Sequence, residues 1–414
     1  MKFLIAKAAI GRWIAKRNSI KSLAEYILRG RTLVRVPRKP LTAVLSMGEK
    51  GHAYSAVRAV KALGYRVLLI TDTPQLPEMA YADALLKRCP LVEVDKILTE
   101  LEAFQLDAVM VSTDHILLPA QDRIARKFGL VSVGAETAEL NNDKLAWRRA
   151  LAANGVRQPK FSRNPNKFVG QSCVRKPRYG RGSAGVIFLN AKDEKVQHSG
   201  AEYFFESALH GEQYDLEGVV KDGNISLLGH VFEKYQYHCG NFVSHYFLFN
   251  FPISPHKITE LRSCAIKTLE AADVKNGAFH VEMRMNGTLA EPIDFANRIS
   301  GYERCMSFSS GIDLAISHVS AFYPTQHHLH FGKKRPLIQY FCWTEQEYRQ
   351  ACVIRDANPE WVFDANMEQH NICGQRCYGM IAFFHDDHNK LIQMVQGLKL
   401  RLPEELCRNL ASAA

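Results

Sequence analysis

The sequence lacks the features of a membrane-spanning or disulfide-stabilised protein. No stretch approaches the roughly 18 to 20 uncharged apolar residues that cross a bilayer. The ten cysteines are scattered, and the only close pair, Cys373 and Cys377, has a spacing that fits neither a zinc ribbon nor a thioredoxin motif. Internal repeats and low-complexity tracts are also missing. We therefore expect a soluble, cytoplasmic protein whose thiols are reduced.

Acidic residues are nearly absent from one end of the chain. Residues 1–40 contain 11 Lys or Arg and only Glu25 as an acid, so this segment carries +10 of the formal net charge of +11. Apolar residues interleave with its cations in a pattern compatible with an amphipathic helix. Such a helix could pack on the protein or within a homo-oligomer, and an anionic membrane surface or nucleic acid is a less favoured partner.

The pattern after Pro40 alternates strands with helices. Apolar strands are predicted at residues 41–47, 66–71 and 108–112, with helices at 53–63 and 116–128. This alternation predicts a parallel α/β sheet. The loop at residues 48–52 follows the first strand, at the edge where open parallel sheets bind ligands. Its glycine spacing does not match a dinucleotide fingerprint.

The stretch from Val174 to Val186 joins a strand end to cations and three glycines. Glycines allow backbone N–H groups to approach phosphate oxygens, and Lys176 and Arg181 add positive charge. A Walker loop has its lysine after the last glycine, whereas Lys176 precedes the glycines. Taken alone, the stretch fits a basic hairpin turn on a solvated surface better than a phosphate site. Its meaning depends on the segments around it.

Those segments carry further candidates for phosphate and metal binding. Upstream, residues 142–151 read as an N-cap followed by a helix, and Lys144 falls in the first turn of that helix. Downstream, residues 202–218 form an apolar segment with acidic residues, and residues 277–301 contain a hairpin with further acids.

This order of segments resembles the ATP-grasp superfamily over roughly residues 41 to 320. The resemblance implies a role for each candidate residue, and it implies ATP and Mg²⁺, or Mn²⁺ in its place, as cofactors. The implied phosphate-contacting lysines are Lys144 and Lys176, and the implied loop over the phosphates contains Gly180, Arg181, Gly182 and Ser183. The implied adenine hinge is Glu206, Ser207, Ala208 and Leu209. The implied metal carboxylates are Glu282 and Asp294, and Arg298 would face the transferred phosphoryl group. Lys176 and Arg298 are the implied catalytic residues.

The resemblance leaves two ligand positions open. A ribose carboxylate is expected seven residues after Glu206, where this chain has Gln213. The neighbouring candidates are Glu212, which we include among the nucleotide-binding residues, and Glu217. The superfamily usually has Asn two residues after its second metal carboxylate, but this chain has Ala296. Asn297 or water could supply that oxygen.

The register of the hairpin decides which acids can share a metal. Asn286-Gly287 between apolar runs predicts a two-residue turn, which would place Glu282 opposite Glu291 and put Asp294 on the other face. Pro292 cannot donate to the strand ladder, and a one-residue bulge there would return Asp294 to the face of Glu282. Without the bulge, Glu291 is the alternative ligand.

The resemblance implies a carboxylate–amine ligase that forms an amide or peptide bond through an acyl phosphate and releases ADP and phosphate. Its substrates would be a small carboxylate and an amine, and Glu49, His52 and Asp114 are weak candidates for holding the acceptor. A biotin-dependent or carbamoyl-phosphate type of activation is disfavoured, because the chain lacks an attached carrier segment and a second copy of the domain. The alternative is a catalytically weak ATP-binding regulatory or assembly protein, which Ala296 and Gln213 keep open.

The expected fold class is α/β and α+β. A Rossmann-like parallel α/β domain at residues 41–140 would precede an ATP-grasp fold at 141–320, in which two sheets clasp ATP. Residues 1–40 would be a basic N-terminal extension, and residues 321–414 a small C-terminal α/β cap.

Overall fold

The computed structural model describes residues 38–47, 53–180, 182, 184–190, 202–238, 241–324, 332–372, 375–400, 402, 403 and 406. Its contacts divide the chain into two units, Met1–Lys39 and Pro40–Ala414, and the second unit is the one described below. The predicted helix of the basic extension lies outside the described residues, and so do the candidates Glu49, His52, Arg181 and Ser183.

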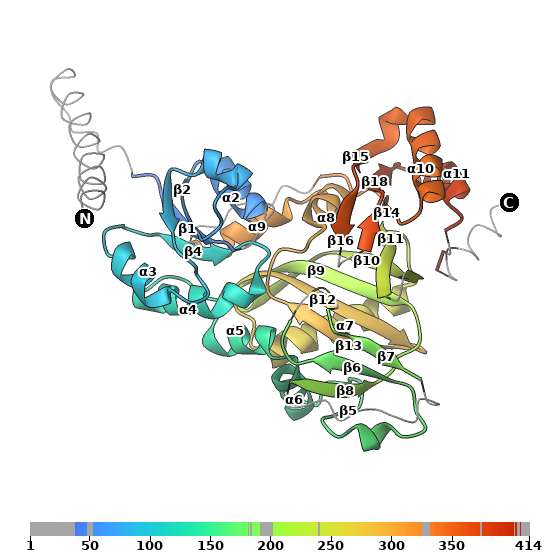
Figure 1. Cartoon of the computed structure of the whole chain (residues 1–414), viewed down its shortest axis with the longest axis horizontal. Coiled ribbons are helices and arrows are strands. Elements are labelled where there is room, and N and C mark those ends of the chain that lie inside the picture. The colour runs from blue at the N-terminus through green and yellow to red at the C-terminus, as the bar shows by residue number, and fades with distance from the viewer. Residues whose placement is uncertain are drawn as a thin grey trace. The chain divides into compact units, whose positions relative to one another are not determined.

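A four-stranded parallel sheet begins the second unit, in the order β3-β2-β1-β4 (Figure 1). Its strands are β1 Leu41–Leu45, β2 Arg66–Thr71, β3 Ala84–Lys87 and β4 Ala108–Val111, and its helices are α2 Tyr54–Ala62, α3 Val94–Leu101 and α4 Leu118–Lys127. Every residue of β1 and β4 is buried, as expected for strands of a sheet covered on both faces. The predicted parallel α/β part is confirmed, and β3 and α3 add to it.

Two helices then lead into a small antiparallel sheet. The helices are α5 Ala135–Asn142 and α6 Lys144–Ala153, and the sheet has the order β5-β8-β6-β7. Its strands are β5 Phe161–Ser162, β6 Cys173–Pro177, β7 Ile187–Leu189 and β8 Tyr203–Ser207. Figure 1 shows this sheet beside the β12–β13 end of a larger sheet.

The larger sheet is antiparallel and has eight strands in the order β13-β12-β9-β10-β11-β14-β18-β15. The bounds are β9 Gln213–Lys221, β10 Asn224–His238, β11 Asn241–Phe249, β12 Gly277–Asn286, β13 Leu289–Ala296, β14 Leu337–Cys342, β15 Val362–Asn366 and β18 Gly379–Phe384. Strands β14, β15 and β18 come from the segment expected to form a cap, and they extend this sheet rather than build a separate one.

Helices cover parts of the larger sheet. Helix α7 Pro255–Ala271 packs its apolar face against β9, β12 and β13, where Leu261 and Leu269 join a core with Leu216 and Val281. The other elements are α8 Glu303–Ser310, α9 Leu314–Ser320, α10 Glu345–Ala357 and α11 His388–Met394, a hairpin of β16 His370–Ile372 and β17 Gln375–Cys377, and short 3₁₀ helices η1 Pro77–Tyr81, η2 His115–Leu117, η3 Pro165–Phe168, η4 Pro359–Trp361 and η5 Gln396–Leu398.

The β12–β13 hairpin contains the predicted bulge. Glu282 pairs with Asp294 and Met283 with Pro292, so Ile293 is the extra residue and Asp294 shares a face with Glu282. The turn itself differs from the prediction by one residue. Asn286 is the last residue of β12 and pairs with Leu289, so the loop is Gly287-Thr288 rather than Asn286-Gly287.

Two further expectations concern the part of the chain that the structure describes. No helix in that part is long and apolar enough to cross a bilayer. The seven cysteines described there are free thiols, and Cys173, Cys264, Cys305, Cys342 and Cys377 are buried.

Candidate functional site

The start of helix α6 is fastened to the end of strand β6. The Asp143 carboxylate caps α6 by accepting from the backbone N–H groups of Leu145 and Ala146, at 3.0 and 3.2 Å. Asp143 also forms an ion pair with Arg178, and the Lys144 backbone N–H donates to the Arg178 carbonyl at 2.9 Å. Burial acts to raise the pKa of Asp143, but the Arg178 guanidinium and the amide donors outweigh it and lower that pKa. These bonds bring Lys144 close to Lys176 on β6.

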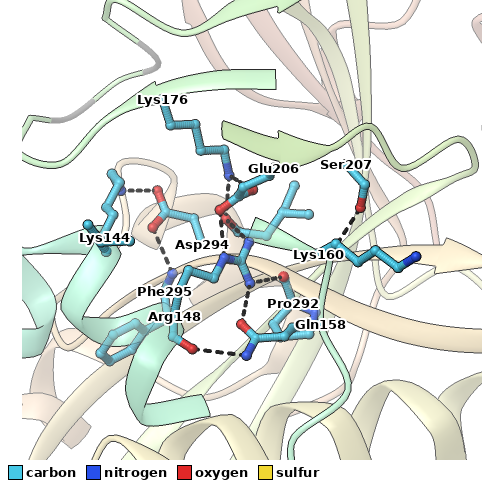
Figure 2. Close-up of polar contacts among 12 residues, drawn as sticks. Lys144, Arg148, Gln158, Lys160, Lys176, Glu206, Ser207, Pro292, Asp294 and Phe295 are labelled. Atoms are coloured by element: carbon cyan, nitrogen blue, oxygen red, sulfur yellow. Dashed lines mark hydrogen bonds and ion pairs between the residues drawn. The ribbon is translucent and has the colours of Figure 1, made fainter. Parts of the chain in front are cut away.

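Lys176 belongs to a buried ion cluster, which Figure 2 shows. Its ammonium lies 2.9 Å from Oε2 of Glu206 on β8, and Arg148 Nε of α6 lies 2.6 Å from Oε1 of the same carboxylate. Burial acts to raise the pKa of Glu206, but the charges of Arg148 and Lys176 outweigh it and lower that pKa. The carboxylate is therefore ionised and shared by two cations.

The same two cations bind the bulge of β13. Arg148 Nη1 donates to the Pro292 carbonyl at 2.8 Å, and Arg148 Nη2 donates to the Ile293 carbonyl at 3.3 Å. Lys176 Nζ donates to the Ile293 carbonyl at 2.7 Å. A bulge disrupts the strand ladder locally, so its carbonyls need other donors. The cluster therefore ties β8 to the strand that carries Asp294.

Asp294 forms an ion pair with Lys144 (Figure 2). Burial opposes ionisation, but the charges of Lys144, Lys176 and His115 outweigh it and lower the pKa of Asp294 to about 2. The Asp294 side chain keeps 32% of its surface exposed, so it remains accessible to a ligand. The predicted lysines and the predicted metal acid thus lie in one site.

A row of acids continues from Glu282 across the large sheet. Glu282 lies opposite Asp215 on β9, and His280 bridges Glu282 and Glu217 through its two ring nitrogens, at 3.2 and 2.8 Å. Burial acts to lower the pKa of His280, but the hydrogen bonds with Glu217 and Glu282 outweigh it and raise the pKa well above its usual value. Burial and then the charge of Glu233 raise the pKa of Asp215 well above its usual value. This face of the sheet therefore gathers several carboxyl groups, and the His280 imidazole contacts two of them.

The residues present fit a hard divalent cation that is also bound by phosphate. Among the described side chains, no group of three or more His, Cys, Asp or Glu is arranged to hold a metal. Glu282 and Asp294 face each other across the hairpin and are both partly exposed. Two carboxylates completed by phosphate oxygens and water suit Mg²⁺, which prefers oxygen ligands and retains water.

The segment predicted as the adenine hinge, residues 206–209, comprises the last two residues of β8 and the two residues after it. The Ser207 backbone N–H donates to the Lys160 carbonyl at 2.8 Å, and the Ala208 N–H donates to the Ser172 carbonyl at 3.0 Å. The side chains of Ala208 and Leu209 are half-buried. The glycine-rich loop lies between β6 and β7, which pair directly, and Gly180 and Gly182 adopt positive φ angles of 126° and 61°. Residues with a Cβ rarely take such angles, so glycine is required there.

The three ribose candidates differ in the face of the sheet on which they lie and in their partners, because side chains alternate between the two faces along a strand. Glu212 accepts from Tyr214 Oη and pairs with Lys257 of α7 at 2.8 Å, so it lies toward the helix-covered face. Gln213 is buried on the opposite face, where it donates to Glu233 and accepts from Arg284, at 2.7 and 3.2 Å. The structure therefore does not bring Glu212 into the ion cluster. Glu217 shares the face of Gln213 but is fully buried against His280 and Ser300.

Arg298 follows β13 next to the parallel sheet. The backbone N–H of Ile299 donates to the carbonyl of Ser112, which follows β4, at 3.1 Å. The Arg298 guanidinium donates to the Ile299 carbonyl at 3.0 Å. Asn297 is buried and donates to the Ala278 carbonyl, so it holds β13 to β12. Asp114, the remaining acceptor candidate, is buried after β4 and accepts from the Met47 N–H at 3.4 Å.

Sequence reasoning missed two residues of this site. From the sequence, Arg148 was predicted only to lie in a helix and His280 only to lie in a strand, and neither was given a role in the site. The available signal for Arg148 was its place four residues after Lys144, which puts both on one helix face. The signal for His280 was its place two residues before Glu282, on the same face of a strand.

The comparisons with known proteins give a domain and a fold. Residues 141–267 match the family model of an ATP-grasp domain. No curated protein matches the sequence. The chain is similar to the crystal structure of the L-amino acid ligase from Bacillus licheniformis, with a TM-score of 0.70 and 15% identity over 88% of this chain and 98% of that chain.

Two other solved structures have the same fold. Phosphoribosylglycinamide synthetase from Anaerococcus prevotii gives a TM-score of 0.67 at 12% identity, over 87% of this chain and 98% of that chain. Carboxyaminoimidazole ribonucleotide synthase from Aspergillus clavatus, solved with ATP, gives 0.66 at 13% identity, over 87% and 97%. At these identities the likeness establishes the fold, and it confirms the predicted fold class.

Proposed function

We propose that this protein, whose residues 141–267 form an ATP-grasp domain, is an ATP-dependent carboxylate–amine ligase that releases ADP and phosphate. The observation that carries the proposal is the convergence of Lys144, Lys176 and Asp294 beside Glu282. Cations for a polyphosphate and carboxylates for its metal meet at one end of the large sheet. The L-amino acid ligase with the same fold supports amino-acid-like substrates.

In this proposal the two lysines bind the phosphates of ATP, and residues 206–209 hold the adenine. The loop at Gly180–Gly185 closes over the phosphates and excludes water. Glu282 and Asp294 would hold Mg²⁺, which supplies positive charge to the phosphate oxygens when bound. Gln213, rather than Glu212, is the ribose candidate that shares the face of Glu282.

The reaction then follows from two displacements. A substrate carboxylate oxygen attacks the γ-phosphorus of ATP, and the bond to the bridging oxygen of ADP breaks. An amine nitrogen next attacks the carbonyl carbon of the acyl phosphate. The C–N bond forms, the C–O bond to phosphate breaks, and the amine loses a proton. Arg298, between the parallel sheet and the large sheet, stabilises the charge that develops on the oxygens.

An isotope experiment tests this chemistry directly. The protein is incubated with ATP, Mg²⁺ and a panel of amines and carboxylic acids labelled with ¹⁸O in the carboxylate, and ADP, AMP and phosphate are measured. An acyl phosphate transfers one ¹⁸O from the acid to the released phosphate. Release of AMP and pyrophosphate, or of unlabelled phosphate, would refute the mechanism. ATP binding without turnover across the panel would favour a regulatory ATP-binding protein.

A further inference from the structure

Arg148 is a buried cation whose position none of the proposed chemistry explains. Its side chain has no exposed surface, and its guanidinium contacts two separate strands. It pairs with Glu206 on β8 and donates to the carbonyls of Pro292 and Ile293 on β13. An arginine presents several N–H donors in a planar fork, so one side chain can serve all three acceptors.

The charge count of the cluster depends on this residue. Glu206 is one negative charge with two cationic neighbours, Arg148 and Lys176, so the three groups together carry +1. Without Arg148, Glu206 and Lys176 would form a neutral pair. A neutral pair attracts phosphate less than a net cation does.

The hydrogen-bond donors of Lys176 also indicate that Arg148 favours phosphate binding at Lys176. An ammonium has three N–H donors, and Lys176 uses two of them on Glu206 Oε2 and the Ile293 carbonyl. Its side chain keeps 14% of its surface exposed, so the third donor can reach a ligand. Arg148 occupies Glu206 Oε1, which would otherwise offer Lys176 a second acceptor.

We infer that Arg148 is a positioning residue that keeps the Lys176 ammonium available to a nucleotide phosphate by balancing the charge of Glu206. This inference rests on the proposed nucleotide site. Its consequence is that the hinge acid Glu206 and the phosphate lysine can share an ion cluster without cancelling the positive charge of the site.

A set of four proteins tests the inference by binding alone. ATP and adenosine binding are measured without substrates for wild type, Arg148→Met, Glu206→Gln and the double variant. Arg148→Met should weaken ATP binding about tenfold or more, the value of one charge-assisted contact. Adenosine binding should stay unchanged, because it has no phosphate. The double variant again carries +1, so its ATP affinity should return to within about threefold of wild type.

The alternative outcomes separate the inference from the proposed function. Equal loss of ATP and adenosine affinity, or a double variant as weak as Arg148→Met, would show that Arg148 only supports the hinge and the bulge, and would overturn the inference. If Arg148→Met does not fold, Arg148→Lys and the double variant, which buries no unpaired carboxylate, provide the comparison. Wild type that binds no ATP would overturn the proposed function itself.

Discussion

Replacing Lys176 with methionine should weaken nucleotide binding far more than it weakens the fold. Methionine keeps the apolar stem and removes the ammonium. Glu206 keeps its bond to Arg148, so no buried carboxylate is left without a cation. The Ile293 carbonyl also keeps a donor, because Arg148 Nη2 reaches it at 3.3 Å. The penalty of about 3 to 5 kcal/mol for breaking a buried ion pair therefore does not apply, and we expect the free energy of unfolding to fall by about 1 kcal/mol.

The effect on ATP follows from the lost contact. A hydrogen bond to a charged group contributes about 1.5 to 3 kcal/mol, which corresponds to a dissociation constant roughly 10 to 150 times higher. Titration calorimetry with ATP and urea unfolding of the same samples measure the two quantities. Lys167→Met is the matched control, because Lys167 is exposed on the 3₁₀ helix η3 outside the ion cluster. Unchanged ATP affinity, or a loss of stability above about 3 kcal/mol, would refute this assignment of Lys176.

Three further predictions test the rest of the molecule. Asp294→Asn should raise the Mg²⁺ concentration required for ADP release at least about tenfold, because the bulge places Asp294 opposite Glu282. Glu291→Gln should change this concentration little, and the reverse ranking would place the metal at Glu291. Burial and the charge of Glu282 raise the pKa of Glu233 to about 7, so this group should make wild type lose stability as pH rises from about 4 to about 7. Urea unfolding without metal should therefore show a smaller loss of stability for Glu233→Gln than for wild type between about pH 5 and about pH 8, and an equal loss in both proteins would contradict this. Deleting residues 1–38 should leave ATP-dependent ADP release unchanged and should abolish any salt-sensitive cosedimentation with anionic vesicles or nucleic acid; a folded truncation without activity would contradict the view that this segment is an appendage.

The sequence predicted the parts of the fold that depend on local signals. Asp143 caps a helix whose first turn holds Lys144, and the alternating strands and helices after Pro40 form the parallel sheet. Pro292 indicated the bulge because a residue without an N–H is tolerated mainly at edges and bulges. Each of these signals acts over a few residues.

The position of the hairpin turn was wrong because a second constraint overrides the local one. An Asn-Gly turn of type I′ needs positive φ at both central residues. Gly287 has a φ of 65°, but Asn286 belongs to β12 and is not among the described residues with positive φ. Asn286 instead pairs with Leu289, and its side chain donates across the hairpin to Glu291 at 2.9 Å.

The contacts of Arg148 could not be predicted from the sequence. Helix periodicity places it on the face of Lys144, but its partners Glu206 and Pro292 lie 58 and 144 residues away. A buried arginine and a surface arginine look the same in a single helix. The faces of Glu212 and Gln213 have the same difficulty, because alternation assigns them only after the start of β9 is known.

Each of the two site lysines pairs with one of the protein's own carboxylates, Lys144 with Asp294 and Lys176 with Glu206. These two pairs differ in what a nucleotide would do to them. Glu206 has Arg148 as a second partner, so Lys176 can contact phosphate without leaving it. Asp294 has only Lys144 as its ion-pair partner among the described residues, so metal binding to Asp294 would release that lysine toward the phosphates. In the proposed function, metal binding at Asp294 would therefore be coupled to nucleotide binding at Lys144, because each step would supply a new partner for a charge that the other displaces.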